Sequence, residues 1–396
     1  MTSRTQAATR AVRAAIESDT QYGAVVPPLH LSSNFAFAGF GDKRQYDYTR
    51  SGNPTRDALA DVLAQLEGGA GAVVTSSGMA ALTLLAYLLE PGDLLIAPHD
   101  CYGGTYRLFD NLAKKGYFDV EFVDQTDASA LAAACERQPA MILTETPSNP
   151  LLRIVDIEGI AAIAKRCGAL LAVDNTFLSP ALQQPLALGA DLVIHSTTKY
   201  INGHSDVVGG TVVARTEELA EKLTWWANCI GCTGAPFDSY LTLRGVRTLH
   251  ARMRQHEESA GLLAKLLDEH PSVNRVYYPG LDSHPGHDIA VRQQSGFGGM
   301  ISFEIDGGEA AVRAFVDSLR YFSLAESLGG VESLVCHPAS MTHAPVCEAA
   351  LAEAGIGQNL VRLSVGLEST DDLVADILAA LDAASKALSL APVAVA

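Results

Sequence analysis

The residue of this chain that most strongly suggests catalytic chemistry is a lysine preceded by two hydroxyl side chains. Lys199 follows Ser196 and Thr198, and the apolar run 192–194 before them is typical of a short buried strand. We therefore expect Lys199 in the loop beyond a strand's carboxyl end, where open α/β sheets bind ligands. The hydroxyls could hold a phosphate there, and a desolvated lysine could act as a Schiff-base nucleophile. A solvated surface lysine is the alternative that this stretch leaves open.

A carboxylate at the end of a second apolar run strengthens this interpretation. The run 170–173 reads as another buried strand and ends at Asp174. If the two strands are parallel neighbours joined by a short crossover, Asp174 and Lys199 lie at the same edge of the sheet. A lysine that can form a Schiff base, a carboxylate that keeps a pyridinium nitrogen protonated and a phosphate site are what pyridoxal phosphate needs from a protein.

A glycine at a strand-to-helix turn offers a second phosphate contact. In the turn 76–79, Gly78 and Met79 stand where a helix should begin, and backbone N–H groups at a helix N-terminus bind anions. A simple turn glycine is the alternative. No G-x-G-x-x-G pattern follows a predicted strand, which counts against a nicotinamide cofactor.

An aromatic and a cationic side chain complete the set of candidate site residues. Tyr102 follows the predicted strand 94–97, where its ring could stack on a flat cofactor and its phenol could move protons; a core tyrosine is the alternative. Arg362 alternates with apolar residues in the predicted strand 361–365, so its guanidinium faces away from the apolar layer. It could grip a carboxylate through two hydrogen bonds, or form only a surface salt bridge.

The composition excludes several classes of protein. The 396 residues are 48% hydrophobic and 18% charged, as expected for a globular protein of about two domains. With 28 basic and 45 acidic side chains the formal charge is −17, which argues against nucleic acid or an anionic membrane as a partner. No run is apolar enough for a membrane span. The basic first residues resemble a transit peptide but contain no signal-type apolar core, so a mobile N-terminal arm is favoured.

The cysteines indicate a reducing compartment, and we expect a cytoplasmic protein. Seven cysteines, an odd number in a large chain, do not suggest a disulfide framework. Cys229 and Cys232 form a C-x-x-C pair, but neither a thioredoxin-like context nor a second ligand pair accompanies it. We expect no metal site, and the role of this pair stays open.

The order of patterns predicts three regions. Residues 1–56 contain many glycine and proline breaks and are expected to form an irregular arm over a neighbouring subunit. Residues 57–250 alternate strands and helices, which predicts a mostly parallel doubly wound sheet in a large α/β domain. Residues 251–396 read as a smaller α+β domain. Individual predicted elements are strands at 72–75, 94–96, 141–144, 300–305 and 361–365, and helices at 157–167, 310–319 and 373–388.

Three short stretches resemble a known family. Asp174 to Phe177, Ser196 to Tyr200 and Gly203 to Asp206 are similar to the Cys/Met-metabolism family of pyridoxal phosphate-dependent enzymes, which act in trans-sulfuration. The similarity runs from about residue 21 to 368. It implies an aspartate aminotransferase-like structure of fold type I, a pyridoxal 5'-phosphate cofactor and small amino-acid substrates. It also implies a homodimer with shared active sites, further assembled into a tetramer.

The resemblance assigns a role to each candidate residue. Lys199, Tyr102 and Asp174 are the catalytic residues it implies, with Lys199 bonded to the cofactor, Asp174 at its ring nitrogen and Tyr102 stacked on its ring. The implied cofactor contacts also include Gly78, Met79, Ser196 and Thr198 at the phosphate, Asn149 at the phenolic oxygen, and Tyr48 and Arg50 reaching the phosphate of a neighbouring subunit. The implied substrate contacts are Arg362 and Ser327 at the carboxylate and Arg107 nearer the distal group, together with Glu326, Asn149 and Tyr48.

The implied reaction is a γ-replacement that joins an O-acylhomoserine, either O-succinyl or O-acetyl, with cysteine to give cystathionine in methionine biosynthesis. The segments 225–228 and 233–240 resemble bacterial members that catalyse this replacement. Ser51 stands where members using O-succinylhomoserine can carry a second arginine, so the acyl group stays open, and γ-elimination of cystathionine to cysteine, 2-oxobutanoate and ammonia is the alternative. A nicotinamide oxidoreductase lacks its glycine fingerprint, and a non-catalytic scaffold does not explain Lys199 together with Asp174.

Overall fold

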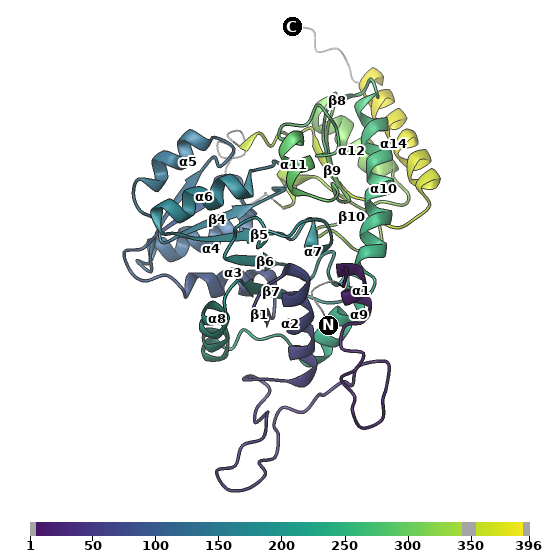
Figure 1. The fold of residues 1–396 in the computed structure, drawn as a ribbon. Helices are drawn as coiled ribbons and strands as arrows, with labels where there is room; N and C mark the ends of the chain where they lie inside the picture. The colour runs from purple at the N-terminus through teal and green to yellow at the C-terminus, as the bar shows by residue number, and fades with distance from the viewer. Residues whose placement is uncertain (1–4, 343–353, 391–396) are drawn as a thin grey trace. The chain divides into compact units, whose positions relative to one another are not determined.

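The computed structural model of the protein describes residues 5–342 and 354–390, which form two compact units (Figure 1). Unit 1 comprises the chain up to Pro98 with Gly104–Glu145 and Asp156–Ala251. Unit 2 comprises His99–Gly103, Thr146–Val155 and the chain from Arg252 onward. Among the residues described, no helix is both long and apolar enough to span a membrane. The predicted domain boundaries at 56 and 250 stay a prediction.

Unit 1 is built on a seven-stranded sheet in the order β1-β7-β6-β5-β4-β2-β3. The strands are β1 (Gly71–Thr75), β2 (Leu94–Pro98), β3 (Asp119–Val123), β4 (Met141–Glu145), β5 (Leu170–Asp174), β6 (Leu192–His195) and β7 (Gly210–Ala214). The five strands from β6 to β3 are parallel to one another, and β7 is antiparallel to both β1 and β6. The sheet is therefore mostly parallel, as predicted.

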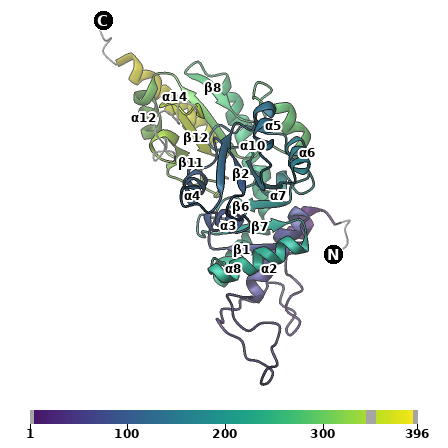
Figure 2. The same cartoon turned by 90° about the vertical axis from the view of Figure 1, so that its left-hand side faces the viewer.

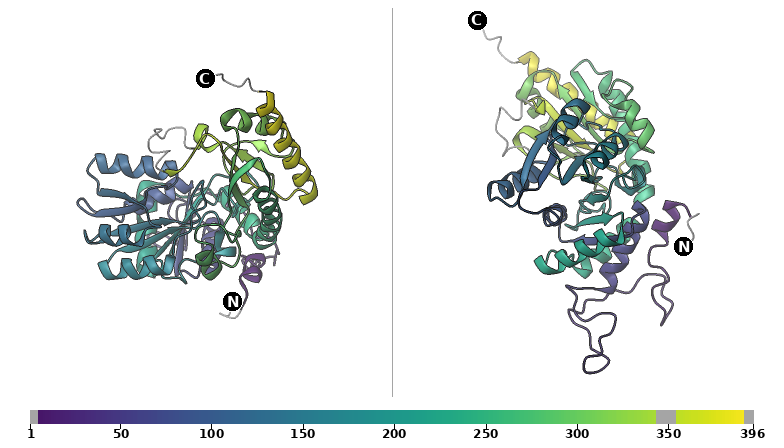
Figure 3. Two further views of the ribbon diagram at one scale, coloured as in Figure 1. Left: turned by 90° about the horizontal axis from the view of Figure 1, so that it is seen from above. Right: turned by 60° about the vertical axis from the view of Figure 1, so that its left-hand side comes forward.

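Helices cover both faces of this sheet, as the view from above shows (Figure 3). They are α2 (Pro54–Glu67), α3 (Gly78–Ala86), α4 (Gly103–Lys114), α5 (Ala128–Cys135), α6 (Ile157–Cys167), α7 (Ser179–Leu182), α8 (Glu217–Ile230) and α9 (Pro236–Val246). Alternate strand residues such as Leu95 and Leu143 pack with Leu85 of α3 and Phe109 of α4. Residues on the other face are also buried, which explains why these strands read as continuous apolar runs.

Unit 2 contains a five-stranded sheet in the order β10-β11-β12-β9-β8. Its strands are β8 (Val273–Tyr277), β9 (Met300–Ile305), β10 (Ser323–Leu324), β11 (Leu334–Cys336) and β12 (Leu360–Ser364). Its helices are α10 (Leu249–Asp268), α11 (His287–Gln293), α12 (Gly308–Ser318), α14 (Thr370–Leu390) and the 3-10 turn Pro338–Ser340. One face of the sheet packs against α10, α12 and α14 around Phe303 and Phe315.

The N-terminal segment is mostly irregular, as expected, but it contains one helix that the sequence analysis did not predict. Helix α1 spans Ala7–Val12, where alanines favour helix and Ala11 is buried. The chain between α1 and α2 then runs as long loops, pinned by isolated bridges such as Asn34 with Tyr48 (Figure 2). Contact of this arm with a neighbouring subunit stays a prediction.

Candidate active site

Asp174 and the Lys199 loop lie at the same edge of the large sheet. Strands β5 and β6 are parallel neighbours, and Asp174 is paired in register with Ile194, one residue before β6 ends at His195. Burial raises the pKa of the Asp174 carboxyl above its ordinary value, although the backbone N–H of Thr176 donates a 3.0 Å hydrogen bond to it. A buried carboxylate whose ionisation is opposed in this way favours a cationic partner.

The loop that carries Lys199 is fixed by its own hydrogen bonds. The backbone N–H of Ser196 donates to the Thr176 hydroxyl at 2.9 Å, and the N–H of Gly203 donates to the Lys199 carbonyl at 2.8 Å. The neighbouring ring of Tyr200 is fully buried. Lys199 is therefore held by a rigid turn rather than by a mobile surface loop, and its side chain is partly buried.

The predicted phosphate turn is a helix N-terminus packed against Ser196. Ser77 caps α3 by accepting a 3.0 Å hydrogen bond from the N–H of Ala80. A Cβ added to Gly78 would lie 2.8 Å from the Ser196 Cβ, so only glycine allows the two segments to approach this closely. The first N–H groups of α3 and the Ser196 hydroxyl thus converge, and together they can bind an anion.

The hydroxyl of Thr198, the second predicted phosphate contact in this loop, is hydrogen-bonded to the backbone of Gly209. Its hydroxyl donates to the Gly209 carbonyl at 3.2 Å and accepts from the Gly209 N–H at 3.0 Å. Because a hydroxyl has a single proton to donate, Thr198 can donate to a phosphate only if it releases the Gly209 carbonyl.

The donor set in unit 1 fits pyridoxal phosphate. A helix N-terminus and the Ser196 hydroxyl suit the phosphate, and the Lys199 amine is in a loop beside them. Burial raises the pKa of Asp174, and a cation beside it, such as a protonated pyridine nitrogen, would stabilise its ionised form.

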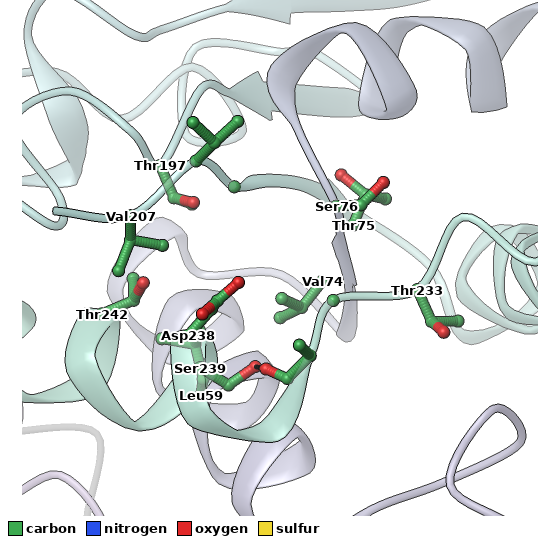
Figure 4. A pocket seen from close by; sticks show the side chains of 14 residues that line it. Leu59, Val74, Thr75, Ser76, Thr197, Val207, Thr233, Asp238, Ser239 and Thr242 are labelled. Atoms are coloured by element: carbon green, nitrogen blue, oxygen red, sulfur yellow. Dashed lines mark hydrogen bonds between the residues drawn. The ribbon is translucent and has the colours of Figure 1, made fainter.

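A separate pocket lies beside these residues (Figure 4). The side chains of Thr197 and Asp238 point into it, and Ser76 and Gly209 also line it. The carboxylate of Asp238 would repel a phosphate, so this pocket is not the anion site.

In unit 2, the predicted carboxylate-binding arginine is buried. Arg362 on β12 is 2% exposed, and its Nη1 donates to the Asn149 Oδ1 at 2.7 Å. Its Nη2 donates to the carbonyl of Ser327 at 3.1 Å. The alternative of a surface salt bridge is wrong, since the side chain is inside the protein and both of these acceptors are neutral.

Ser327 adopts a strained backbone conformation next to this arginine. Its φ is +88°, a region that side-chain-bearing residues seldom occupy, and it aims the Ser327 carbonyl at Arg362. The N–H of Gly329 donates to the Ser364 hydroxyl at 2.8 Å, which holds the strained turn against β12. Such strain is typical of binding sites. Glu326, just before it, is exposed.

The segment that carries Tyr102 is tied to the segment that carries Asn149. Asp100 accepts hydrogen bonds from the Ser148 hydroxyl at 2.7 Å and from Arg153 at 3.1 Å. The Tyr102 side chain is 40% exposed, so a core position is excluded for it. Arg107, on α4 in unit 1, is also exposed.

In the arm, Arg50 contacts both Tyr48 and α8 of its own chain. The Arg50 guanidinium lies 5.7 Å from the centre of the Tyr48 ring. Its Nη1 donates to the Asn228 carbonyl at 2.6 Å and to the Asn228 Oδ1 at 2.9 Å. Both side chains are exposed, so the residues predicted to serve a second subunit lie on an accessible surface.

Sequence reasoning missed a buried polar group at the edge of the sheet. Glu67, the last residue of α2, contacts His195 at 2.6 Å and Asn175 at 3.0 Å, and all three are buried. The signal that could have found it is an acidic residue directly after Leu66, on the apolar side of a helix. Over the two described ranges, no group of three or more His, Cys, Asp and Glu side chains could hold a metal, and Cys229 and Cys232 are free thiols.

Comparison with known proteins places this site in a family. A sequence model described as "Cys/Met metabolism PLP-dependent enzyme" matches residues 8–382. Cystathionine gamma-synthase of Escherichia coli is 57% identical over 380 residues, which cover 96% of this chain and 98% of that protein.

Solved structures extend the likeness over the whole fold. Cystathionine gamma synthase from Xanthomonas oryzae pv. oryzae, in complex with aminoacrylate and cysteine, superposes with a TM-score of 0.96 at 63% identity, covering 97% of this chain and 99% of that one. Cystathionine gamma-lyase from Lactobacillus plantarum, complexed with L-serine, superposes with a TM-score of 0.93 at 41% identity, covering 96% and 100%.

Proposed function

Because this chain belongs to the Cys/Met metabolism family of pyridoxal phosphate-dependent enzymes, we propose that it joins an O-acylhomoserine with L-cysteine to give L-cystathionine. The observation that carries this proposal is the 57% identity to a cystathionine gamma-synthase over 96% of the chain. The reaction is a γ-replacement, in which the thiol of cysteine takes the place of the acyloxy group.

The residues of unit 1 would hold the cofactor. When bound, pyridoxal phosphate supplies an electron sink for negative charge that develops on the substrate carbons. Asp174 would accept the ring N–H and keep that nitrogen protonated. The N–H groups at Gly78 and Met79 and the Ser196 hydroxyl would bind the phosphate, with Thr198 joining once its hydroxyl is released from Gly209.

Lys199 and Tyr102 would move protons. Tyr102 takes the proton that the incoming substrate amine must lose, and its exposed position gives it access to solvent and substrate. The Lys199 amine then removes protons at Cα and Cβ of the substrate. The acyloxy group leaves from Cγ, and the cysteine sulfur forms its bond at the same carbon.

The residues of unit 2 would orient the amino-acid substrate. Arg362 holds the α-carboxylate by a two-point grip, and Asn149 and Ser327 fix the plane of its guanidinium. Asn149 would in addition contact the cofactor's phenolic oxygen. Arg107 would contact the distal acyl group, and Glu326 would be a further substrate contact; both are exposed.

The assembly proposed is a homodimer with shared active sites, further paired as a tetramer. Tyr48 and Arg50 on the exposed arm would bind the cofactor phosphate held by a neighbouring subunit, and Tyr48 its substrate. A cytoplasmic location suits the cysteine content of the chain.

A product assay tests the function. The purified protein is incubated with O-succinylhomoserine, O-acetylhomoserine or cystathionine, each with and without cysteine. We expect cystathionine to form from an O-acylhomoserine only when cysteine is present. Failure to form cystathionine from either ester would overturn the proposal.

A second candidate function is the γ-elimination of cystathionine. The structural likeness to a cystathionine gamma-lyase supports it, at the lower identity of 41%. Release of 2-oxobutanoate from cystathionine faster than cystathionine formation from both esters would favour this alternative.

A further inference from the structure

One carboxylate oxygen of Glu67 contacts two residues at the ends of different strands of the large sheet. Oε1 of Glu67 lies 2.6 Å from the His195 Nε2 and accepts a 3.0 Å hydrogen bond from the Asn175 Nδ2. Glu67 is 2% exposed, His195 1% and Asn175 0%. The contact is therefore closed to solvent, and no water competes for either bond.

The two partners of Glu67 adjoin the two residues on which the chemistry depends. Asn175 directly follows Asp174 at the end of β5, and His195 ends β6 and directly precedes Ser196 in the loop of Lys199. Through one oxygen atom, Glu67 thus ties the end of β5 to the end of β6.

A further pair of hydrogen bonds makes this tie rigid. The Asn175 amide also donates to the Gln183 carbonyl at 2.8 Å and accepts from the Gln183 Nε2 at 3.0 Å. Asn175 therefore has a single orientation, and a shift of the Glu67 carboxylate is transmitted to the backbone next to Asp174.

The buried position of the Glu67 carboxylate does not maximise the stability of the folded protein. A carboxylate without solvent is costly to bury, and its second oxygen, Oε2, has no hydrogen-bond partner in the part of the chain that the structure describes. The same holds for Nδ1 of His195. An apolar residue at the end of α2 would avoid this penalty, so the polar group is retained for something other than folding.

We propose that Glu67 is a positioning residue, whose carboxylate, through His195 and Asn175, sets the placement of Asp174 relative to the Lys199 loop and thereby the binding of pyridoxal phosphate. This inference rests on the proposed function, since it concerns the same cofactor site. Glu67 acts through its neighbours and has no contact of its own with substrate.

The test compares Glu67→Gln with a matched control, Asp376→Asn. Asp376 in α14 is also a buried carboxylate, 4% exposed, and it accepts hydrogen bonds of 2.9 Å from the N–H groups of Arg320 and Tyr321. Both variants lose one buried charge and keep the side-chain shape. The measurements are the melting temperature of the cofactor-free protein, the Kd for pyridoxal phosphate by fluorescence titration, and kcat and KM for the O-acylhomoserine.

We expect both variants to melt at a lower temperature, but only Glu67→Gln to bind the cofactor more weakly. Loss of a group that orients site residues lowers affinity or turnover by about tenfold to a hundredfold. We expect that change in the cofactor Kd and in kcat, with the KM for substrate within about threefold of the wild type, since the carboxylate grip is untouched.

Two outcomes overturn the inference, and they are distinguishable. If wild-type protein binds the cofactor and Glu67→Gln binds it equally well, Glu67 is only structural and the proposed function stands. If wild-type protein binds no cofactor, the proposed function and this inference fall together. Should Glu67→Gln not fold, Asn175→Ser is judged by the same Kd and kcat criteria, because it keeps the carboxylate and removes the amide that bonds to Glu67 and Gln183.

Discussion

At the residue scale, the site consists of ordinary side chains made unusual by their surroundings. Lys199 is partly buried in a rigid turn, Asp174 has a pKa raised by burial, and Arg362 is 2% exposed with two neutral acceptors. Each of these groups would be unremarkable on the surface. Burial is what prepares each of them for a charged partner.

Replacing the lysine is expected to abolish turnover. Lys199→Ala removes both the bond to the cofactor and the proton carrier, so kcat should fall by several orders of magnitude, on the order of 10³-fold or more. Lys165→Ala, at an exposed position of α6, is the control and should keep wild-type kcat. After borohydride treatment, mass spectrometry should find the cofactor attached to the Lys199 peptide. Near-normal turnover in Lys199→Ala would refute its role.

The raised pKa of Asp174 predicts a pH-dependent gain in stability for Asp174→Asn without cofactor. Because the carboxyl ionises less readily in the folded chain, the folded state binds more protons than the unfolded state above the ordinary pKa of 3.8. Stability therefore falls as pH rises through that window. At pH 7 the cofactor-free variant should melt about 1–3 °C higher than the cofactor-free wild type, and the difference should shrink toward pH 4.

Calorimetry of both cofactor-free proteins across this pH range checks the prediction. The same variant should bind pyridoxal phosphate more weakly, since an amide cannot balance a pyridinium charge. A variant that melts lower than the wild type at pH 7 would show that burial of the charge is not the dominant effect.

At the scale of elements, close approach of backbone segments forms the site. The N-terminus of α3 meets the loop after β6 because position 78 has no side chain, and α2 places Glu67 beneath the ends of β5 and β6. Parallel strands present their carboxyl ends at one edge, so short loops there share a common site.

Substitution of Gly78 tests this close approach. In Gly78→Ala the new Cβ would lie 2.8 Å from the Ser196 Cβ, so α3 or the Lys199 loop must shift. We expect a loss of about 1–3 kcal/mol in stability and weaker binding of both the cofactor and free phosphate. Gly261→Ala in α10 is the matched control, because its nearest atom would be the Tyr278 hydroxyl at 3.9 Å. Equal cofactor affinity in the two variants would contradict the assigned role of the turn.

At the scale of the whole molecule, the fold type I architecture expected from the family resemblance is confirmed, because structures of that family superpose over nearly the whole chain. The net charge of −17 requires that anionic substrates be held by specific cations such as Arg362 rather than by the general field. The exposed arm bears Tyr48 and Arg50, whose proposed role needs a second chain.

Mixing two inactive variants tests whether active sites are shared. Arg50→Ala and Lys199→Ala each damage every site in their own homo-oligomers. In a mixed dimer, one site combines an intact Lys199 with an intact Arg50 from the other subunit. Random exchange of equal amounts should therefore restore about a quarter of wild-type activity. Absence of recovery, when native mass spectrometry shows mixed oligomers, would place Arg50 within its own subunit's site or outside it.

The sequence by itself determined the parts of the fold that depend on local pattern. Strands β5 and β6 are apolar on both faces, so the sequence could be recognised as buried strands there. Helix α6 was predicted at its observed bounds, 157–167. Position in a strand also indicated that Asp174 and Lys199 would share an edge. Alternation indicated that Arg362 faces away from the apolar layer, although not that it is buried.

Only the tertiary structure decided which distant residues meet. Arg362 and Asn149 are 213 residues apart, and Glu67 and His195 are 128 apart, so no local pattern could pair them. The path of the chain also decides that β7 lies antiparallel between β1 and β6. It likewise brings Gly209 to the Thr198 hydroxyl, with which its backbone forms two hydrogen bonds. Local sequence sets the preference of each segment, whereas these contacts follow from the packing of distant segments within each of the two units.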